Sequence, residues 1–176
     1  GQLPWYNRDY TGKIFLEHKE LLEEHVWLLF RYDTPIAWND DNAITAFKEG
    51  RTKINGSLQG LLLSCAADGR IDRARLLKSS LEALVMGRSK GSWFIGIIEG
   101  LQPASAELLP HQDLILQGLT TKLSGSLKLL LRLLRQLADE PTFNYNDFIA
   151  AISGLLYDMA QTNMSIVCAT FESIAK

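Results

Sequence analysis

The C-terminal third of the chain repeats its own pattern with an offset of 36 to 37 residues. Residues 119–123 match 155–159, and residues 134–138 match 171–175. Apolar residues recur at helical spacing inside each unit. A single helix pair cannot bury its apolar stripe alone, so a period of this length is typical of stacked helix pairs. We therefore predict an all-α fold, an α-solenoid (α-α superhelix) of antiparallel HEAT-like helix pairs.

The composition supports a folded chain without a general attraction to polyanions. The 176 residues are 47% hydrophobic, which is ample for a buried core. A net charge of -2 and a pI near 5.9 give no overall attraction to nucleic acid or to anionic lipid. The longest apolar run is shorter than the roughly 20 residues needed to cross a bilayer, and no secretion signal opens the chain. We expect partners to be recognised by local patches, and no membrane insertion.

The two cysteines favour a reducing compartment. Cys65 and Cys168 each lie in an apolar helical run, which predicts two buried, reduced core thiols and no disulfide framework. We therefore expect a cytoplasmic protein. The chain begins with Gly1 in place of Met and stops just after an amphipathic helix, so we expect an excised piece of a longer protein, with further repeats beyond it.

Periodicity and helix-ending residues divide the chain into an N-terminal helical cap and loop over residues 1–50 and a repeat array over residues 51–176. Gly69 and Gly87 are expected to end helices, and Pro110 is expected to interrupt one. Asp72 is expected to cap a helix, and the last two helices are expected to be capped by Asn144 or Asn146 and by Thr162 or Asn163. Helices are predicted over residues 10–32 (one long or two short), about 52–67, 72–86, 89–101 or 91–101, 106–119, 122–139, 144–160 and 162–175.

The predicted helix over residues 122–139 has the clearest inner stripe. It consists of Leu123, Leu127, Leu130, Leu134 and Leu137. Among the tryptophans, Trp27 and Trp93 fall beside aliphatic neighbours and are expected in the core. Trp5 and Trp38 lie in segments of poor periodicity and are candidates for recognition if exposed.

One segment resembles a known family. Residues 68–77 read Asp-Gly-Arg-Ile-Asp-Arg-Ala-Arg-Leu-Leu, followed by Ser80-Leu81, by Trp93-Phe94 and by Leu-Leu-Pro-His-Gln-Asp over residues 108–113. The segment is similar to a bacterial family of unknown function, whose members are built from HEAT-like α-helical repeats. The resemblance covers roughly residues 23–176 and departs from the family at Pro103-Ala104, where Pro-Thr is usual. It implies the fold, and it implies no catalytic residues.

Two groups of basic residues are the candidate partner-binding sites. Lys128, Arg132 and Arg135 form a basic ridge at helical spacing; Arg70, Arg73 and Arg75 form an arginine cluster beside two aspartates. The basic ridge can be an ordinary solvent-facing stripe, and it can dock an acidic protein partner. The arginines of the cluster can pair locally with the two aspartates, and they can anchor a partner because arginine suits interfaces. The basic ridge can also contact phosphates.

The sequence contains no complete motif for metal binding, nucleotide binding or catalysis. His18 and His25 lie seven residues apart, whereas zinc ligands on one helix usually lie about four apart. The residue 68–72 segment has Arg70 at a position where a calcium loop needs an oxygen ligand. The residue 87–92 loop lacks the glycine spacing and the preceding strand of a nucleotide-binding loop. His111, like the other two histidines, lies in no recognisable catalytic setting. We predict no catalytic, cofactor-binding or metal-ligating residues.

These observations favour a non-catalytic helical-repeat scaffold that binds a protein partner of unknown identity. Two alternatives stay open at this point. The first is a nucleic-acid-binding HEAT-like repeat domain, and the second is a ligand-binding or enzymatic helical domain with a site between helices.

Overall fold

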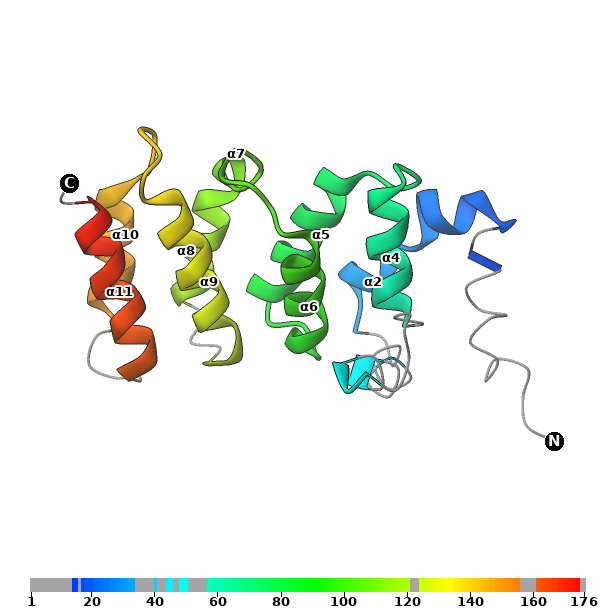
Figure 1. The fold of residues 1–176 in the computed structure, drawn as a ribbon, viewed down its shortest axis with the longest axis horizontal. Helices are drawn as coiled ribbons and strands as arrows, with labels where there is room; N and C mark the ends of the chain where they lie inside the picture. The colour runs from blue at the N-terminus through cyan, green and yellow to red at the C-terminus, as the bar shows by residue number, and fades with distance from the viewer. Residues whose placement is uncertain are drawn as a thin grey trace. The chain divides into compact units, whose positions relative to one another are not determined.

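The described part of the protein is all-α. The computed structural model describes residues 14–15, 17–33, 40, 44–45, 48–50, 57–120, 124–155 and 161–174. Across these residues the elements are helices joined by turns, without a β-strand (Figure 1). The chain divides into two compact units, residues 1–79 and 80–176. The boundary expected near residue 50 stays a prediction.

A π-helical turn precedes α2 (Leu28–Arg31) in the first unit, where the sequence predicted regular helix. This turn, η2, spans Leu21–His25, and Val26 N donates to Leu21 O at 2.8 Å, five residues back. The helix α2 follows, and Trp27 at its N-cap and Phe30 within it are buried. Tyr32 is extended, with φ −122° and ψ 146°, so the helix ends where the sequence predicted.

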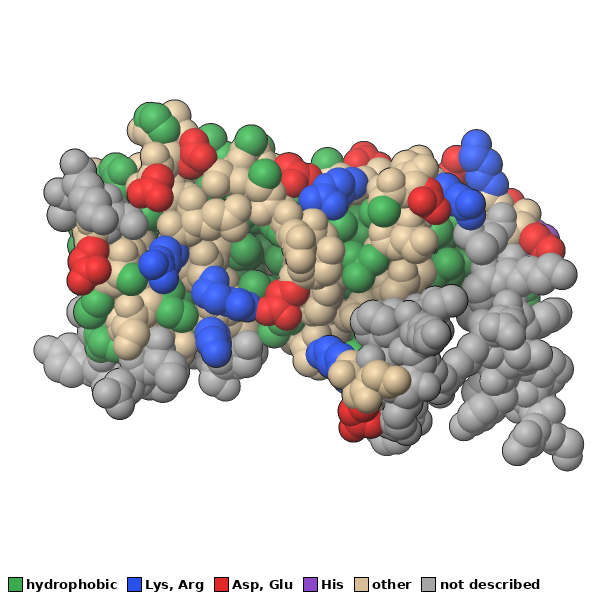
Figure 2. Space-filling view, in the orientation of Figure 1, with side chains coloured by type: hydrophobic (Ala, Val, Ile, Leu, Met, Phe, Trp, Pro, Cys, Tyr) green, Lys and Arg blue, Asp and Glu red, His purple; other side chains and the backbone are tan. Residues whose placement is uncertain are grey.

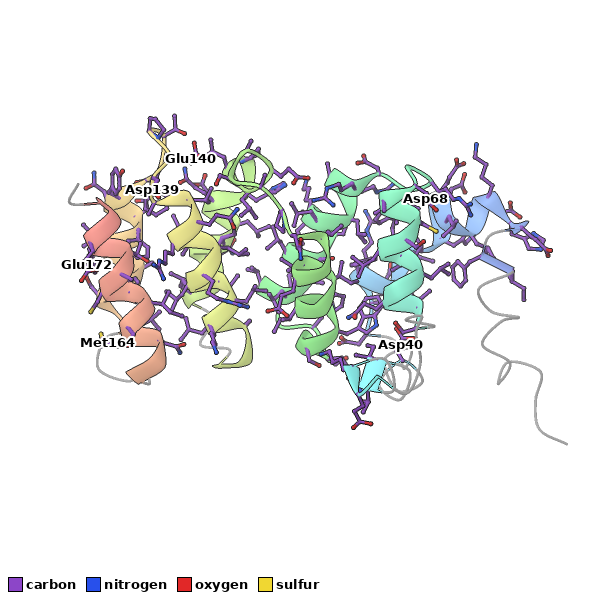
Figure 3. The ribbon with its side chains drawn as sticks, in the orientation of Figure 1. Asp40, Asp68, Asp139, Glu140, Met164 and Glu172 are labelled. Atoms are coloured by element: carbon purple, nitrogen blue, oxygen red, sulfur yellow. The ribbon has the colours of Figure 1, made fainter. Side chains whose placement is uncertain are left out.

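The helix α4 (Leu58–Ala67) begins later than the predicted start near residue 52. Ser57 has extended backbone angles, and its Oγ accepts a hydrogen bond from Gly60 N at 2.9 Å, which fixes the first turn. The buried carboxylate of Asp40 adds a second cap, since it accepts from Leu58 N at 2.6 Å and from Gln59 N at 2.9 Å. Figure 3 labels Asp40 at this end of α4.

The turn from α4 to α5 (Arg73–Val85) follows the prediction closely. Gly69 has φ +70°, the left-handed conformation that glycine adopts readily. Asp72 Oδ1 accepts from Ala74 N at 2.9 Å and from Arg75 N at 3.2 Å, which caps α5 as expected.

The second unit contains a succession of short helices. Their bounds are α6 Gly91–Leu101, α7 Ser105–Leu108, a 3-10 turn η3 Leu109–His111, α8 Gln112–Thr120, α9 Ser124–Leu137, α10 Tyr145–Ser153 and α11 Gln161–Ile174. Gly87 ends α5 with φ 68°, and Pro110 lies in η3 between α7 and α8, both as predicted.

Two helix ends were predicted wrongly in this unit. The helix α10 stops at Ser153 and does not run on to residue 160, and residues 156–160 lie outside the described residues. Gln161 begins α11, so Thr162 and Asn163, predicted as caps, lie within its first turn. Asn144 does cap α10 as expected, since its side chain accepts from Asp147 N.

Two layers of helices form the packing of the second unit. The helix α9 packs against α6, α8 and α11, and α8 packs against α10. In Figure 1, α9 and α11 run side by side, with α8 and α10 behind them. Because α9 has neighbours on three sides, its burial is wider than the predicted stripe. Leu130, Leu134 and Leu137 are buried as predicted, Leu127 is half-buried, Leu123 lies outside the described residues, and Leu129, Leu131 and Leu133 are buried as well.

Gly118 permits the closest approach in this packing. A Cβ at that position of α8 would lie 2.7 Å from Leu130 Cδ1 of α9 and 2.9 Å from Val85 Cγ2 of α5. Both distances are too short for a real contact, so the two neighbours pack directly over the glycine backbone.

Cys65 and the two described tryptophans agree with the prediction, and Cys168 differs from it. Cys65 is buried, whereas Cys168 is exposed, because the buried face of α11 is formed by Asn163, Val167 and Thr170. Cys168 follows Val167 directly, about 100° around the helix, so it points away from that face. Trp27 and Trp93 are buried as predicted, and Trp5 and Trp38 lie outside the described residues. Among the described residues, every helix is too short or too polar to cross a bilayer.

Candidate functional site

The basic ridge lies on the exposed strip of α9. Lys128, Arg132 and Arg135 are exposed, and their spacing of four and three residues places them on one face of the helix. Gln136 continues the same strip. Figure 2 shows Lys and Arg side chains gathered over α9 on this face. The helix α9 therefore presents a strip of positive charge to solvent. Neighbouring helices bury the faces of α9 on both sides of this strip.

A carboxylate from the neighbouring helix pairs with the middle residue of the basic ridge. Arg132 Nη2 donates to Glu99 Oε1 of α6, and both side chains are 48% exposed. Among the described residues no carboxylate forms an ion pair with Lys128 or Arg135. The basic ridge thus keeps a local excess of positive charge despite the chain's net charge of -2.

A groove of about 540 Å³ lies between α6 and α9, beside the basic ridge. Its apolar part consists of Ile98, Pro103, Leu129 and Leu133, and all four are buried. Its polar part consists of Glu99, Gln102, Arg132 and Gln136, and all four are exposed. Hydrophobic side chains are visible between α6 and α9 in Figure 2. The groove therefore has an apolar floor and a polar rim.

The turn after α6, which lines part of the groove, is held to α9 by hydrogen bonds. Gln136 Nε2 donates to Pro103 O at 2.9 Å, and Ser105 Oγ donates to Gln136 O at 3.3 Å. Gln102 ends α6 in the left-handed conformation with φ 47°, which costs a non-glycine residue about 1 kcal/mol. Gln102 lies at the rim of the groove. The hydrogen bonds made by Pro103 and Ser105, which come shortly after it in the chain, hold the turn in this strained conformation.

Acidic residues limit the basic ridge at the C-terminal end of α9. Asp139 is exposed and Glu140 half-buried in the turn directly after the helix, and Figure 3 labels both there. A negatively charged partner is therefore favoured along residues 128–135 and disfavoured beyond them.

The arginine cluster belongs to the first unit, residues 1–79, and Arg70 and Arg75 contact residues of that unit. Arg70 Nε lies 4.0 Å from Asp68 Oδ2, and Arg73 is half-buried. The guanidinium of Arg75 lies over the Trp27 ring, 4.1 Å from its centroid, a cation–π contact that the sequence did not indicate. A role for this cluster in partner binding stays a prediction.

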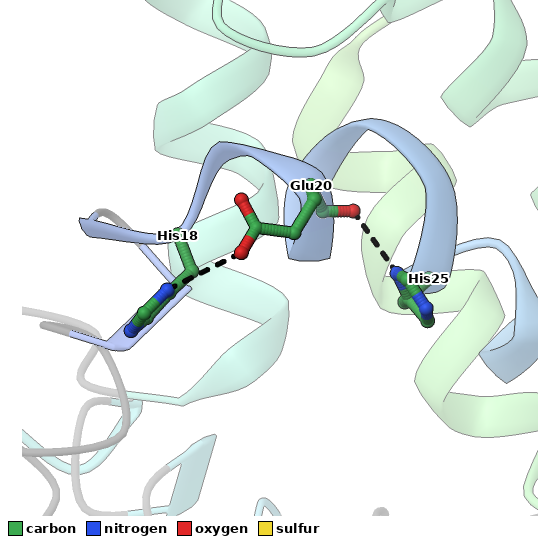
Figure 4. A network of polar contacts seen from close by, with 3 residues as sticks. All are labelled: His18, Glu20 and His25. Carbon is green, nitrogen blue, oxygen red and sulfur yellow. Dashed lines mark hydrogen bonds and ion pairs between the residues drawn. The ribbon is translucent and has the colours of Figure 1, made fainter.

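The histidines near the start of the described chain surround Glu20 (Figure 4). His18 Nδ1 lies 3.3 Å from Glu20 Oε1, and His25 Nδ1 lies 3.2 Å from Glu20 O. The pKa of Glu20 is lowered, first because its carboxylate accepts a hydrogen bond from its own backbone N–H and then because of His18. In the described ranges no three His, Cys, Asp or Glu side chains come close enough to hold a metal ion.

The residue 87–92 loop leads into the N-terminus of α6. Lys90 occupies the N-cap position with φ 67°, and Arg88 Nε is buried without a hydrogen-bond partner. His111 is half-buried in η3, far along the chain from the other two histidines. The structure does not gather these residues into the groove, whose lining comes from α6, α9 and the turn after α6.

Comparisons with known proteins identify a family without assigning an activity. Neither the curated proteins nor the solved structures contain a match to this chain. The model of a family described as a domain of unknown function, DUF6493, matches residues 4–162, and the chain therefore belongs to that family.

Proposed function

We propose that this chain is a non-catalytic, HEAT-like repeat scaffold that binds a protein partner through the basic ridge of α9 and the groove beside it. The observation that carries this proposal is the position of Arg132. It belongs both to the exposed positive strip and to the rim of an apolar groove. Surfaces that combine an apolar centre with an arginine-bearing polar rim are typical of protein interfaces.

The helix lengths of the second unit support a repeat. The helices α9 and α11 each have 14 residues and begin 37 residues apart, and α8 and α10 each have 9 residues. Each pair shares a layer, with α9 beside α11 and α8 beside α10. Successive helix pairs that contact their neighbours in this way are the unit of a solenoid.

The chemistry of the groove supports recognition in place of catalysis. Its polar side chains are two glutamines, one arginine and one glutamate, and the glutamate is ion-paired. This set can donate and accept hydrogen bonds to a peptide, and it includes no activated nucleophile.

Charge reversal on α9 tests the proposed function. The variant with Lys128→Glu, Arg132→Glu and Arg135→Glu should lose a partner that the wild-type chain captures reproducibly from the cells that express it. A control with Arg31→Glu, Lys48→Glu and Lys78→Glu makes the same charge change at exposed positions elsewhere and should retain that partner. Circular dichroism should show equal helix content in both variants. Capture of the same partner by the α9 variant would contradict the proposal.

Nucleic-acid binding is the second candidate, and the basic ridge is the observation that favours it. Three exposed cations on one helix face can contact phosphates. The apolar floor beside them has no use in a phosphate contact, and the lining residues of the groove include no aromatic side chain on which a base could stack. We therefore rank protein binding first.

A further inference from the structure

The α6–α9 groove has a floor suited to a large apolar side chain. Ile98, Leu129 and Leu133 are at most 5% exposed, so the floor of the groove offers only a narrow apolar strip to an occupant. Most of the gain from covering this strip comes from the apolar surface of the occupant's own side chain, which leaves water when it binds. The floor is therefore suited to a single apolar anchor.

The rim of the groove selects the charge of the occupant. Of the basic ridge, Arg132 lines the groove and pairs with Glu99 of α6, and Lys128 and Arg135 lie on the same exposed face of α9. An acidic occupant complements this excess of positive charge, whereas a basic occupant is repelled by it. Asp139 and Glu140 set the limit of that preference at the C-terminal end of α9.

Glu99 already occupies the place that a partner carboxylate would take. It pairs with Arg132 across the two helices, and both groups are about half exposed to solvent. Ion pairs at such exposure are weak and exchange readily with water or with another carboxylate. A partner carboxylate can therefore replace Glu99 on Arg132 without leaving a buried charge unpaired.

The groove is preformed where the turn after α6 lines it. The hydrogen bond from Gln136 to Pro103 O and that from Ser105 to Gln136 O hold the turn after α6 against α9. A preformed site loses less conformational entropy when a ligand binds, which favours binding of a short segment.

Resting on the function proposed above, we propose that the groove binds a short acidic segment of a partner protein with one apolar anchor, and that Glu99 competes with this segment for Arg132. The apolar side chain covers Ile98, Leu129 and Leu133. The acidic side chains pair with the basic ridge. Removal of the Glu99 charge then strengthens binding, whereas a purely structural ion pair would leave binding unchanged or weaken it.

Selection from a random library of displayed 16-residue peptides on the intact chain tests the occupant. The selected peptides should be rich in Asp and Glu and should contain at least one Leu, Ile, Phe, Trp or Met. Replacing the acidic residues of a selected peptide by their amides, or the apolar residue by Ala, should each weaken binding by about 10-fold or more. Neutral or basic selected peptides, or none, would overturn the proposal.

Affinity of one selected peptide for point variants tests the competition. By fluorescence anisotropy, Glu99→Gln should bind about 3- to 10-fold more tightly than wild type, and Arg132→Glu about 10-fold or more weakly. Glu172→Gln removes an exposed carboxylate from α11 of the same unit and should change affinity by less than about 2-fold. An unchanged or weakened affinity of Glu99→Gln would overturn the competitor role.

The outcomes separate this inference from the proposed function. If charge reversal on α9 abolishes partner capture but no acidic peptide is selected, the occupant is wrong and the scaffold function stands. If partner capture survives charge reversal, the proposed function is wrong whatever the peptides show. Tighter binding of a fluorescent 16-nucleotide DNA than of any selected peptide would assign the face to nucleic acid and overturn the inference.

Discussion

The two thiols of this chain lie in opposite environments and should react differently. Cys65 is 1% exposed, and burial raises the pKa of its thiol, so less of the reactive thiolate is present at pH 8. Cys168 is exposed on α11. We expect Ellman's reagent to modify about one thiol per folded chain and about two in guanidinium chloride. A Cys168→Ser variant should lose the native reaction; rapid modification of two thiols in the folded wild type would contradict the buried position of Cys65.

Gly118 should be intolerant of even one extra carbon. The Gly118→Ala change gains helix propensity of about 1 kcal/mol. It also forces Leu130 and Val85 to move from a tightly packed site, at a cost of about 1–3 kcal/mol. We expect a net loss of up to about 2 kcal/mol in the free energy of unfolding, measured by urea denaturation.

The Gly154→Ala variant is the matched control for Gly118. The nearest atom to a Cβ at Gly154 is Ala151 O at 4.0 Å, and its φ of −73° suits any residue. This change should leave stability unchanged or raise it by up to about 1 kcal/mol. Equal effects of the two substitutions would show that packing at Gly118 is not close.

At the scale of elements, α4 depends on a cap that comes from outside it. Asp40 is 18 residues before Leu58 along the chain, yet its carboxylate accepts from the first two N–H groups of the helix. We expect Asp40→Ala to lower the free energy of unfolding by about 1–3 kcal/mol, because one part-buried and one buried N–H group of the helix lose their acceptor.

The chemistry of the Asp40 cap can be separated from the size of the side chain. Asp40→Asn keeps one acceptor oxygen and should lose less stability than Asp40→Ala in the same denaturation experiment. Asp139→Ala, at an exposed position after α9, should change stability by less than about 0.5 kcal/mol. A loss from Asp139→Ala as large as that from Asp40→Ala would contradict the capping role.

Local signals predicted the elements that depend on nearby residues. The cap of α5 at Asp72, the ends at Gly69 and Gly87 and the break at Pro110 are confirmed, because a cap or a breaker acts within one helical turn. The start of α4 was predicted six residues early, since apolar spacing cannot show that Ser57 is extended. The exposed position of Cys168 was missed because polar Asn163 and Thr170 occupy the buried face of α11.

The candidate site was predicted only in part for a related reason. Helical spacing alone placed Lys128, Arg132 and Arg135 on one face of α9, and the structure finds all three exposed. The groove and the pairing of Arg132 with Glu99 join residues 33 apart along the chain. Such contacts depend on how α6 and α9 pack against each other, and this packing cannot be predicted from the spacing of residues within either helix.

At the scale of the whole molecule, the charge balance argues against binding to polyanions. A chain of net charge -2 with three cations on α9 can release few counterions from DNA or RNA. In an electrophoretic mobility shift assay at 50 and 200 mM salt, we expect no complex in the micromolar range at the higher salt. A complex that survives 200 mM salt and is lost in the α9 charge-reversal variant would instead favour the nucleic-acid alternative.

A protein partner bound to the basic ridge of α9 and the α6–α9 groove should shield this face from solvent. Hydrogen–deuterium exchange of the intact chain, with and without the partner captured by wild type, measures that protection helix by helix. We expect slower exchange in residues 98–103 and 127–137 when the partner is bound, and unchanged exchange in α4. Protection confined to other helices, with residues 98–103 and 127–137 unaffected, would show that the partner binds elsewhere.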